Sequence, residues 1–91
     1  MKIEISEDVL FQEVSGETVL LDLASEQYFG LDSVGTRIWA LLNEGAAAAA
    51  VVDTLLGEYE VERETLAADV DELLARLAEA GLIRFVDAAE D

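Results

Sequence analysis

Acidic side chains are the most abundant reactive groups in this chain, whose 91 residues include 21 Asp and Glu, 5 Lys and Arg, and no His or Cys. Without His the chain lacks the commonest general base and metal ligand, and without Cys it lacks disulfides and thiolate metal sites. Carboxylate pairs such as Asp69 and Glu72 arise by chance at this density, and no D-x-D-x-D-G run indicates a calcium loop. We therefore expect no catalysis, no metal ion and no cofactor.

Serine and glycine supply the remaining candidates for chemistry. No serine has a histidine to activate it as a nucleophile. Gly30 and Gly35 flank a predicted helix start, as glycines do in phosphate-binding loops, but their spacing matches neither G-x-x-x-x-G-K nor G-x-G-x-x-G. The sequence predicts instead that Gly35 packs closely against a neighbouring side chain.

The net charge of −16 restricts the partners of this chain. Nucleic acids and anionic lipid surfaces are bound through Lys and Arg, so we expect neither nucleic acid nor a membrane among the partners. Residues 1–5 contain no hydrophobic region of a signal peptide, and no apolar run approaches the roughly 18 residues of a membrane span. The expected location is the cytoplasm.

Three β-rich runs occupy the first third of the chain, at residues 9–14, 17–23 and 26–31. Ser15 and Gly16 separate the first two runs, and a two-residue link with Gly suits a hairpin turn because Gly accepts a positive φ. A second short link precedes the third run. The pattern predicts a three-stranded antiparallel meander, which needs helices on its apolar face to be stable.

Three helices are predicted to follow, at about residues 32–44, 46–59 and 63–80. Asp32 or Ser33 can cap the first helix at its N-terminus, and a glycine follows the first and the third helix. The third helix has the strongest apolar period in the chain. These helices are the elements expected to cover the meander.

Residues 82–86 form an apolar tail, which we interpret as a final strand or a lid on the core. Residues 87–91 are expected to fray. The sequence therefore predicts one α+β domain over residues 1–91, with its core at about 9–86. Three antiparallel strands followed by three helices give a layout like that of a winged helix-turn-helix.

The third helix offers two flanks beside its core-facing sector. At 100° per residue, the residues that share the narrow core-facing sector are Leu66, Val70, Leu73 and Leu77. One flank is a shallow apolar groove of small alanines beside an exposed leucine, with the residues Ala67, Asp71, Leu74 and Ala78. The other flank is polar and carries Asp69, Glu72 and Arg76. The sequence does not decide which flank faces the third strand, and we favour the flank of Leu74.

Six stretches have the order and spacing of a known family, and they lie at residues 19–23, 28–31, 34–42, 55–61, 69–77 and 81–83. On these stretches the chain resembles the PqqD family, small peptide-chaperone domains also called RiPP recognition elements. The similarity covers about residues 9–86. The five alanines at 46–50 depart from the more varied helix residues expected there.

The resemblance implies a non-catalytic domain that binds the leader segment of a ribosomally synthesised precursor peptide and presents it to a maturation enzyme. The leader is expected to add a strand to the third strand of the sheet, in the cleft beside the third helix. Lasso-peptide pathways use such a domain with a leader peptidase, and pyrroloquinoline quinone biosynthesis uses one with a radical-SAM enzyme. The residues expected to bind the leader are Glu26, Gln27, Tyr28, Phe29, Gly30, Leu31, Ala67, Asp71, Leu74 and Ala78.

Strand addition has a physical basis in the predicted meander, because its third strand has one unpaired edge unless the tail covers it. A free edge presents N–H and C=O groups to an extended peptide, and no Pro interrupts this strand. Phe29 and Leu31 share one face of the strand and are interpreted as core residues. Tyr28 points the other way with Glu26 and Gly30, and it is the better candidate for contact with the peptide.

Two other functions remain open at this point. The winged-helix layout is also found in DNA-binding regulators, although the third helix carries more acidic than basic residues. An acidic chain is also suited to act as a docking subunit on a basic enzyme surface, with an association rate that falls steeply with salt.

Overall fold

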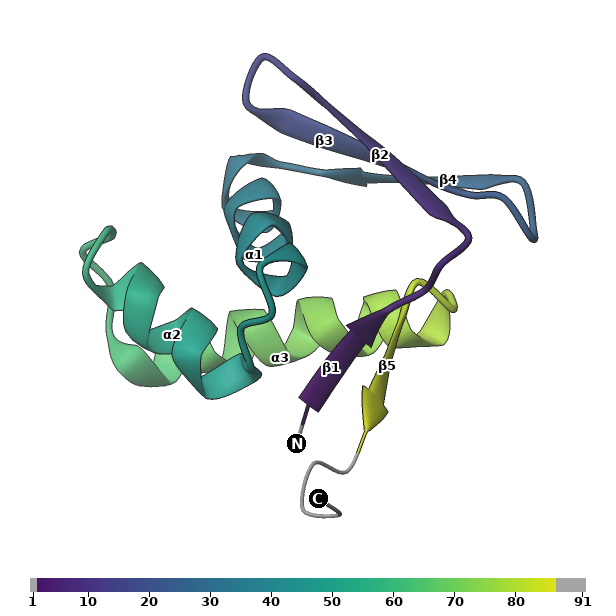
Figure 1. Ribbon diagram of the computed structural model, residues 1–91. Coiled ribbons are helices and arrows are strands. Elements are labelled where there is room, and N and C mark those ends of the chain that lie inside the picture. Colours follow the sequence, from purple (N-terminus) through teal and green to yellow (C-terminus); the bar gives the residue numbers. More distant parts are fainter. Residues whose placement is uncertain (1, 87–91) are drawn as a thin grey trace.

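The fold is built from two small antiparallel sheets and three helices, and its computed structural model describes residues 2–86 (Figure 1). The elements are β1 (Lys2–Ile5), β2 (Val9–Val14), β3 (Glu17–Asp22), β4 (Gln27–Leu31), α1 (Ser33–Asn43), α2 (Ala48–Leu56), α3 (Arg63–Glu79) and β5 (Ile83–Val86). The predicted α+β class is confirmed, with a three-stranded meander followed by three helices. The structure adds a second sheet, of β1 and β5, in which the first strand was not predicted.

The β2–β3–β4 meander follows from its two turns. Ser15 and Gly16 both have positive φ, at 54° and 82°, as expected for the central residues of a two-residue hairpin turn. In the next turn the Asp22 carboxylate accepts hydrogen bonds from the Ala24 backbone N–H at 3.1 Å and from the Ser25 hydroxyl at 2.8 Å. This local network closes the turn that leads into β4.

The junction of β4 and α1 is fixed by a cap and a close contact. Asp32 is the N-cap of α1, and its Oδ1 accepts a hydrogen bond from the Gly35 backbone N–H at 2.8 Å. A Cβ on Gly35 would lie 3.2 Å from the Leu31 Cβ, so the glycine lets β4 and the first turn of α1 approach closely. The predicted close packing of Gly35 is confirmed.

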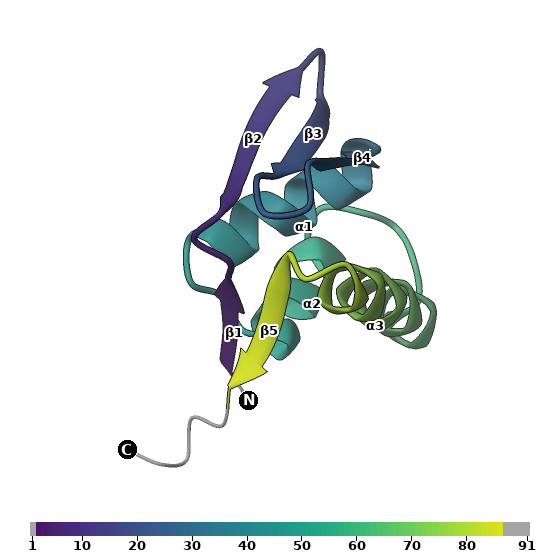
Figure 2. The ribbon, with the colours of Figure 1, turned by 90° about the vertical axis from the view of Figure 1, so that its right-hand side faces the viewer.

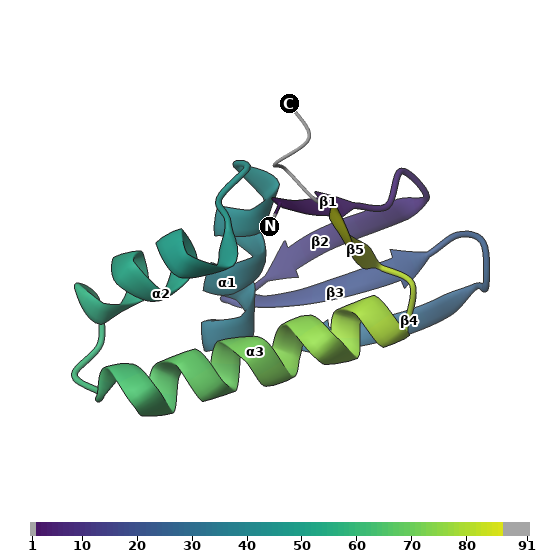
Figure 3. The same cartoon turned by 90° about the horizontal axis from the view of Figure 1, so that it is seen from below.

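Helix α1 lies between the three-stranded sheet and the layer formed by α2 and α3 (Figures 1 and 2). The core joins the inner face of the sheet to all three helices, and its most deeply buried large side chains are Leu20, Leu55, Leu77, Leu82, Val51 and Val70. Viewed from below, α3 runs along the sheet on the side of β4 (Figure 3). This arrangement places α3 opposite the last strand of the meander.

The C-terminal strand β5 pairs with β1 and not with the meander. Its register joins Ile3 to Phe85 and Ile5 to Ile83. An exposed ion pair at 2.7 Å, between Arg84 and Glu4, spans the same two strands. Within residues 2–86, the strand order β2–β3–β4 therefore leaves one edge of β4 without a strand partner.

The orientation of α3 differs from the expectation. Leu74 is only 2% exposed and belongs to the core, whereas Leu73 is partly exposed. The reason is that α3 packs with its Leu74 side toward α2 and the β1–β5 sheet, where Leu74 lies near Ile3 and Ala48. The prediction of an exposed Leu74 beside a buried Leu73 is wrong.

Candidate functional site

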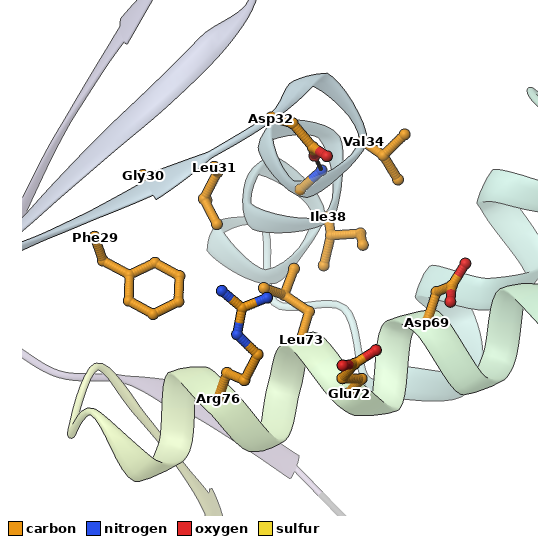
Figure 4. Close-up of a pocket in the computed structure, with 11 residues that line it drawn as sticks. Phe29, Gly30, Leu31, Asp32, Val34, Ile38, Asp69, Glu72, Leu73 and Arg76 are labelled. Atoms are coloured by element: carbon orange, nitrogen blue, oxygen red, sulfur yellow. Dashed lines mark hydrogen bonds between the residues drawn. The ribbon is translucent and has the colours of Figure 1, made fainter.

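A cleft of about 460 Å³ lies between β4 and α3 (Figure 4). Its lining comes from β4, from the first turns of α1 and from the middle of α3. The lining residues are Phe29, Gly30, Leu31, Asp32, Val34, Gly35, Ile38, Asp69, Glu72, Leu73 and Arg76. The cleft therefore lies directly beside β4, the strand whose outer edge has no strand partner in the described part of the chain.

The upper wall of the cleft is apolar because of the alternation of side chains along β4. Phe29 and Leu31 point to the helix side of the sheet, where Leu31 is buried and Phe29 is half-buried. Val34 and Ile38, four residues apart on α1, extend this wall beyond the end of the strand. This wall can bury apolar side chains of a ligand.

The lower wall is mostly polar, because Asp69, Glu72, Leu73 and Arg76 share one face of α3 at helical spacing. The Arg76 guanidinium lies 5.3 Å from the centre of the Phe29 ring, within the range of a cation–π contact. Figure 4 shows Arg76 pointing up toward β4, with Glu72 and Asp69 farther along the helix. Arg76 thus connects the two walls at one end of the cleft.

Tyr28 lies on the opposite face of the sheet and does not line the cleft. Its side chain is 74% exposed, and its cross-strand neighbour is Leu21, which in turn pairs with the exposed Leu10. Tyr28, Leu21 and Leu10 form an apolar row across the outer face of the meander. In a strand added to β4, every second side chain would lie beside this row, and the side chains between them would lie over the cleft.

The structure brings only part of the predicted site together. Phe29, Gly30 and Leu31 line the cleft, while Gln27, at the start of β4, and Glu26, just before it, are exposed and lie outside the lining. Whether a leader contacts any of them stays a prediction.

The residues predicted on α3 do not face β4. Asp71 and Leu74 line a different hollow, with Phe85 of β5, and Ala67 and Ala78 pack half-buried against the core. The expectation that the Leu74 flank faces β4 is therefore wrong, and the polar flank faces it. Asp69, Glu72 and Arg76 are three and four residues apart in the sequence, which places them on one flank of the helix. This spacing identifies the flank, but only the packing of α3 shows that the flank faces β4.

Metal-binding clusters are not found among residues 2–86. No group of three or more Asp or Glu side chains in this range is arranged to hold a metal ion. The same range contains no helix long and apolar enough to cross a membrane. The chemistry available in the cleft is thus hydrogen bonding along β4, apolar burial and charge pairing.

Comparisons with known proteins give a family match and two structural matches. Residues 17–83 match the family model described as coenzyme PQQ synthesis protein D (PqqD). No curated protein matches the sequence. Two solved structures are similar in fold and sequence.

The first of these is TbiB1 in complex with the TbiA(beta) leader peptide, at 41% identity and a TM-score of 0.87 over 92% of this chain and 99% of that chain. The second is lasso peptide synthetase B1 complexed with the leader peptide, at 28% identity and a TM-score of 0.84 over 93% of this chain and 100% of that chain. Both similar proteins were thus solved with a leader peptide bound.

Proposed function

This chain belongs to the PqqD family, and from that premise we propose that it binds the leader segment of a ribosomally synthesised precursor peptide and presents it to a maturation enzyme. Domains of this family bind peptides and catalyse no reaction, so the chain is a non-catalytic domain. The observation that carries the proposal is the free edge of β4 beside the cleft, in a chain 41% identical to a protein solved with its leader peptide.

Strand addition to β4 is the mode of binding that fits the cleft best. Along the outer edge of β4, alternate residues direct N–H and C=O groups away from β3, where an extended peptide can pair with them. Every second side chain of the peptide then enters the cleft over Phe29, Leu31 and Leu73. Main-chain bonds supply affinity for many sequences, and the apolar positions in the cleft select among them.

The expected affinity is sub-micromolar. Burial of two or three apolar side chains contributes roughly 1.5–3 kcal/mol each, and the added ladder of hydrogen bonds contributes further. After the cost of ordering the peptide, a binding free energy on the order of 8–10 kcal/mol is reasonable. Isothermal titration with leader peptides encoded next to this gene measures it directly, with the core segments of the same precursors as negative controls.

A charge placed on the apolar part of the cleft tests the site. Leu73→Asp puts a carboxylate where the leader buries an apolar side chain, so we expect the dissociation constant to rise by about tenfold or more. Leu56→Asp is the matched control, because Leu56 is a half-buried leucine on α2 that does not line the cleft. Thermal melts first confirm that both variants fold, and titration calorimetry then measures the affinity of each for the leader. An equal loss of affinity in the two variants would contradict binding in the cleft.

Backbone methylation of the leader tests strand addition itself. Each N-methyl group removes one backbone donor of the peptide. Methylation should weaken binding at every second position and leave it unchanged at the positions between, because only every second N–H points at β4. Fluorescence anisotropy of a labelled leader measures this series. A uniform response along the peptide would contradict pairing with β4.

The maturation enzyme is a leader peptidase or a radical-SAM enzyme, and the similarity to lasso peptide synthetase B1 supports the peptidase. In reconstitution, a peptidase encoded beside this gene should cleave the precursor faster when this protein is present. Leu73→Asp should reduce that stimulation in parallel with leader binding. Cleavage that is indifferent to this protein would contradict the pairing with a peptidase.

A further inference from the structure

The charges along the cleft are separated by sign. Arg76 lies at the end near Phe29, and its guanidinium is 5.3 Å from the centre of that ring. Glu72 and Asp69 follow along α3 toward the opposite end, and Asp32 lies on the other side of the cleft, at the start of α1 (Figure 4). A peptide in the cleft therefore meets a positive end and a negative end rather than a uniform surface.

These charged groups are available to a ligand. Three other arginines in residues 2–86 are paired with carboxylates, namely Arg37 with Glu58, Arg63 with Asp53 and Arg84 with Glu4. Within the same residues, Arg76 forms no ion pair, and neither Asp69 nor Glu72 takes part in one. The side chains of Asp69, Glu72 and Arg76 are exposed, so binding a charged partner breaks no internal ion pair.

The direction of the added strand relates these charges to the peptide sequence. The meander is antiparallel throughout, and antiparallel pairing is slightly more stable per residue than parallel pairing. A strand added antiparallel to β4 runs from the Leu31 end to the Phe29 end. Its N-terminal part then lies beside Asp69 and Glu72, and its C-terminal part lies beside Arg76.

The spacing of the charges sets the spacing in the peptide. Glu72 and Arg76 are four residues apart, which is about 6 Å along a helix at 1.5 Å per residue. Asp69 and Arg76 are seven residues apart, which is about 10 Å. In a strand, successive residues on one face are about 6.6 Å apart. The separation of Glu72 and Arg76 therefore corresponds to two residues of the peptide, and that of Asp69 and Arg76 falls between two and four residues.

We propose that the leader segment bound by this chain carries a basic side chain followed, two or four residues later, by an acidic side chain, both directed into the cleft. The basic side chain pairs with Glu72 and Asp69, and the acidic side chain pairs with Arg76. The backbone hydrogen bonds alone allow several registers and both directions of the added strand, and the two ion pairs select one direction and one register. This inference rests on the proposed function and adds to it the charge pattern of the ligand.

Charge reversal on both partners tests the pattern. The probes are fluorescein-labelled synthetic leaders from the precursor genes beside this gene, in the native form and with the basic and acidic residues exchanged. Glu72→Lys and Arg76→Glu should each reduce the affinity for the native leader several-fold. The effect is no larger because an exposed ion pair contributes little free energy. The double variant Glu72→Lys/Arg76→Glu should bind the exchanged leader more tightly than the native one.

Matched controls on the same helix separate a specific pair from a change in net charge. Arg63→Glu and Glu79→Lys alter the same types of residue outside the cleft, and affinity for the native leader should change by less than about twofold. Folding of every variant is checked by thermal melts. The preference of the double variant for the exchanged leader should also decrease with rising salt.

The outcomes distinguish this inference from the function on which it rests. If wild type binds a leader but the double variant does not prefer the exchanged peptide, the charge pattern is overturned and leader binding stands. A tightly bound leader without a basic residue two or four positions before an acidic one overturns it as well. If wild type binds none of the leaders, the proposed function fails, and this inference fails with it.

Discussion

Gly30 and Gly35 lie on either side of the junction between β4 and α1, and their surroundings differ. No atom lies within 4 Å of the position that a Cβ on Gly30 would take, whereas a Cβ on Gly35 would lie 3.2–3.3 Å from Leu31 and Asp32 atoms. Leu31 is buried and Asp32 caps α1, so neither neighbour can move without loss. The two glycines therefore have different roles, and only Gly35 is required by packing.

The same substitution at these two glycines should have opposite effects. Gly30→Val should raise the free energy of unfolding by about 0.5–1 kcal/mol, because valine fits an open strand position better than glycine. Gly35→Val should lower it by about 1–3 kcal/mol through overpacking against Leu31. Urea unfolding of both variants measures the difference. A Gly35→Val protein as stable as wild type would contradict the close contact.

At the scale of elements, the ion pair of Arg37 and Glu58 joins α1 to the segment after α2. Arg37 Nη2 donates to Glu58 Oε2 at 2.8 Å, and Arg37 Nε donates to Glu58 Oε1 at 2.9 Å. The hydrogen bond from Arg37 lowers the pKa of Glu58 below its ordinary value of 4.5, and the same bond raises the pKa of Arg37. The pair tethers the helix that begins at the end of β4.

This pair should make a pH-dependent contribution to stability. Because the pKa of Glu58 is lower in the folded state, its contribution is present above the unfolded value of 4.5 and is lost as the pH falls through the folded value. Glu58→Gln should therefore melt at a lower temperature than wild type near pH ~7, and the difference should decrease as the pH falls below 4.5. Melting curves at pH values above and below 4.5 test this. The difference is expected to be small, since both side chains are partly exposed.

At the scale of the whole molecule, the charge of −16 separates this protein from the DNA-binding regulators that share its layout. Helix α3 carries only Arg63 and Arg76 as basic residues, and its cleft-facing flank carries Asp69 and Glu72, so we expect it not to bind a phosphate backbone. We expect no shift of duplex DNA in gel electrophoresis even at low salt, with a basic helix-turn-helix protein as positive control. A salt-sensitive shift would favour the winged-helix regulator instead.

Local sequence signals were sufficient for much of this fold. The positive φ of Gly16, the N-cap of Asp32 and the apolar period of α3 each act within a few residues, so the meander and the three helices were predictable. Strand β1 was not, because Lys2–Ile5 is only four residues long and its partner β5 lies about 80 residues away. Short strands with distant partners leave no local pattern.

The candidate site divides in the same way. The sequence by itself determined that an uninterrupted apolar strand without Pro, from Gln27 to Leu31, precedes a capped helix. Only the tertiary structure decided that β5 pairs with β1 and, among residues 2–86, leaves one edge of β4 without a strand partner. It also decided that Leu73 rather than Leu74 faces the cleft. Adjacent leucines on a helix differ by 100° in direction and not in hydrophobicity, so only the surfaces packed around α3 can select one of them.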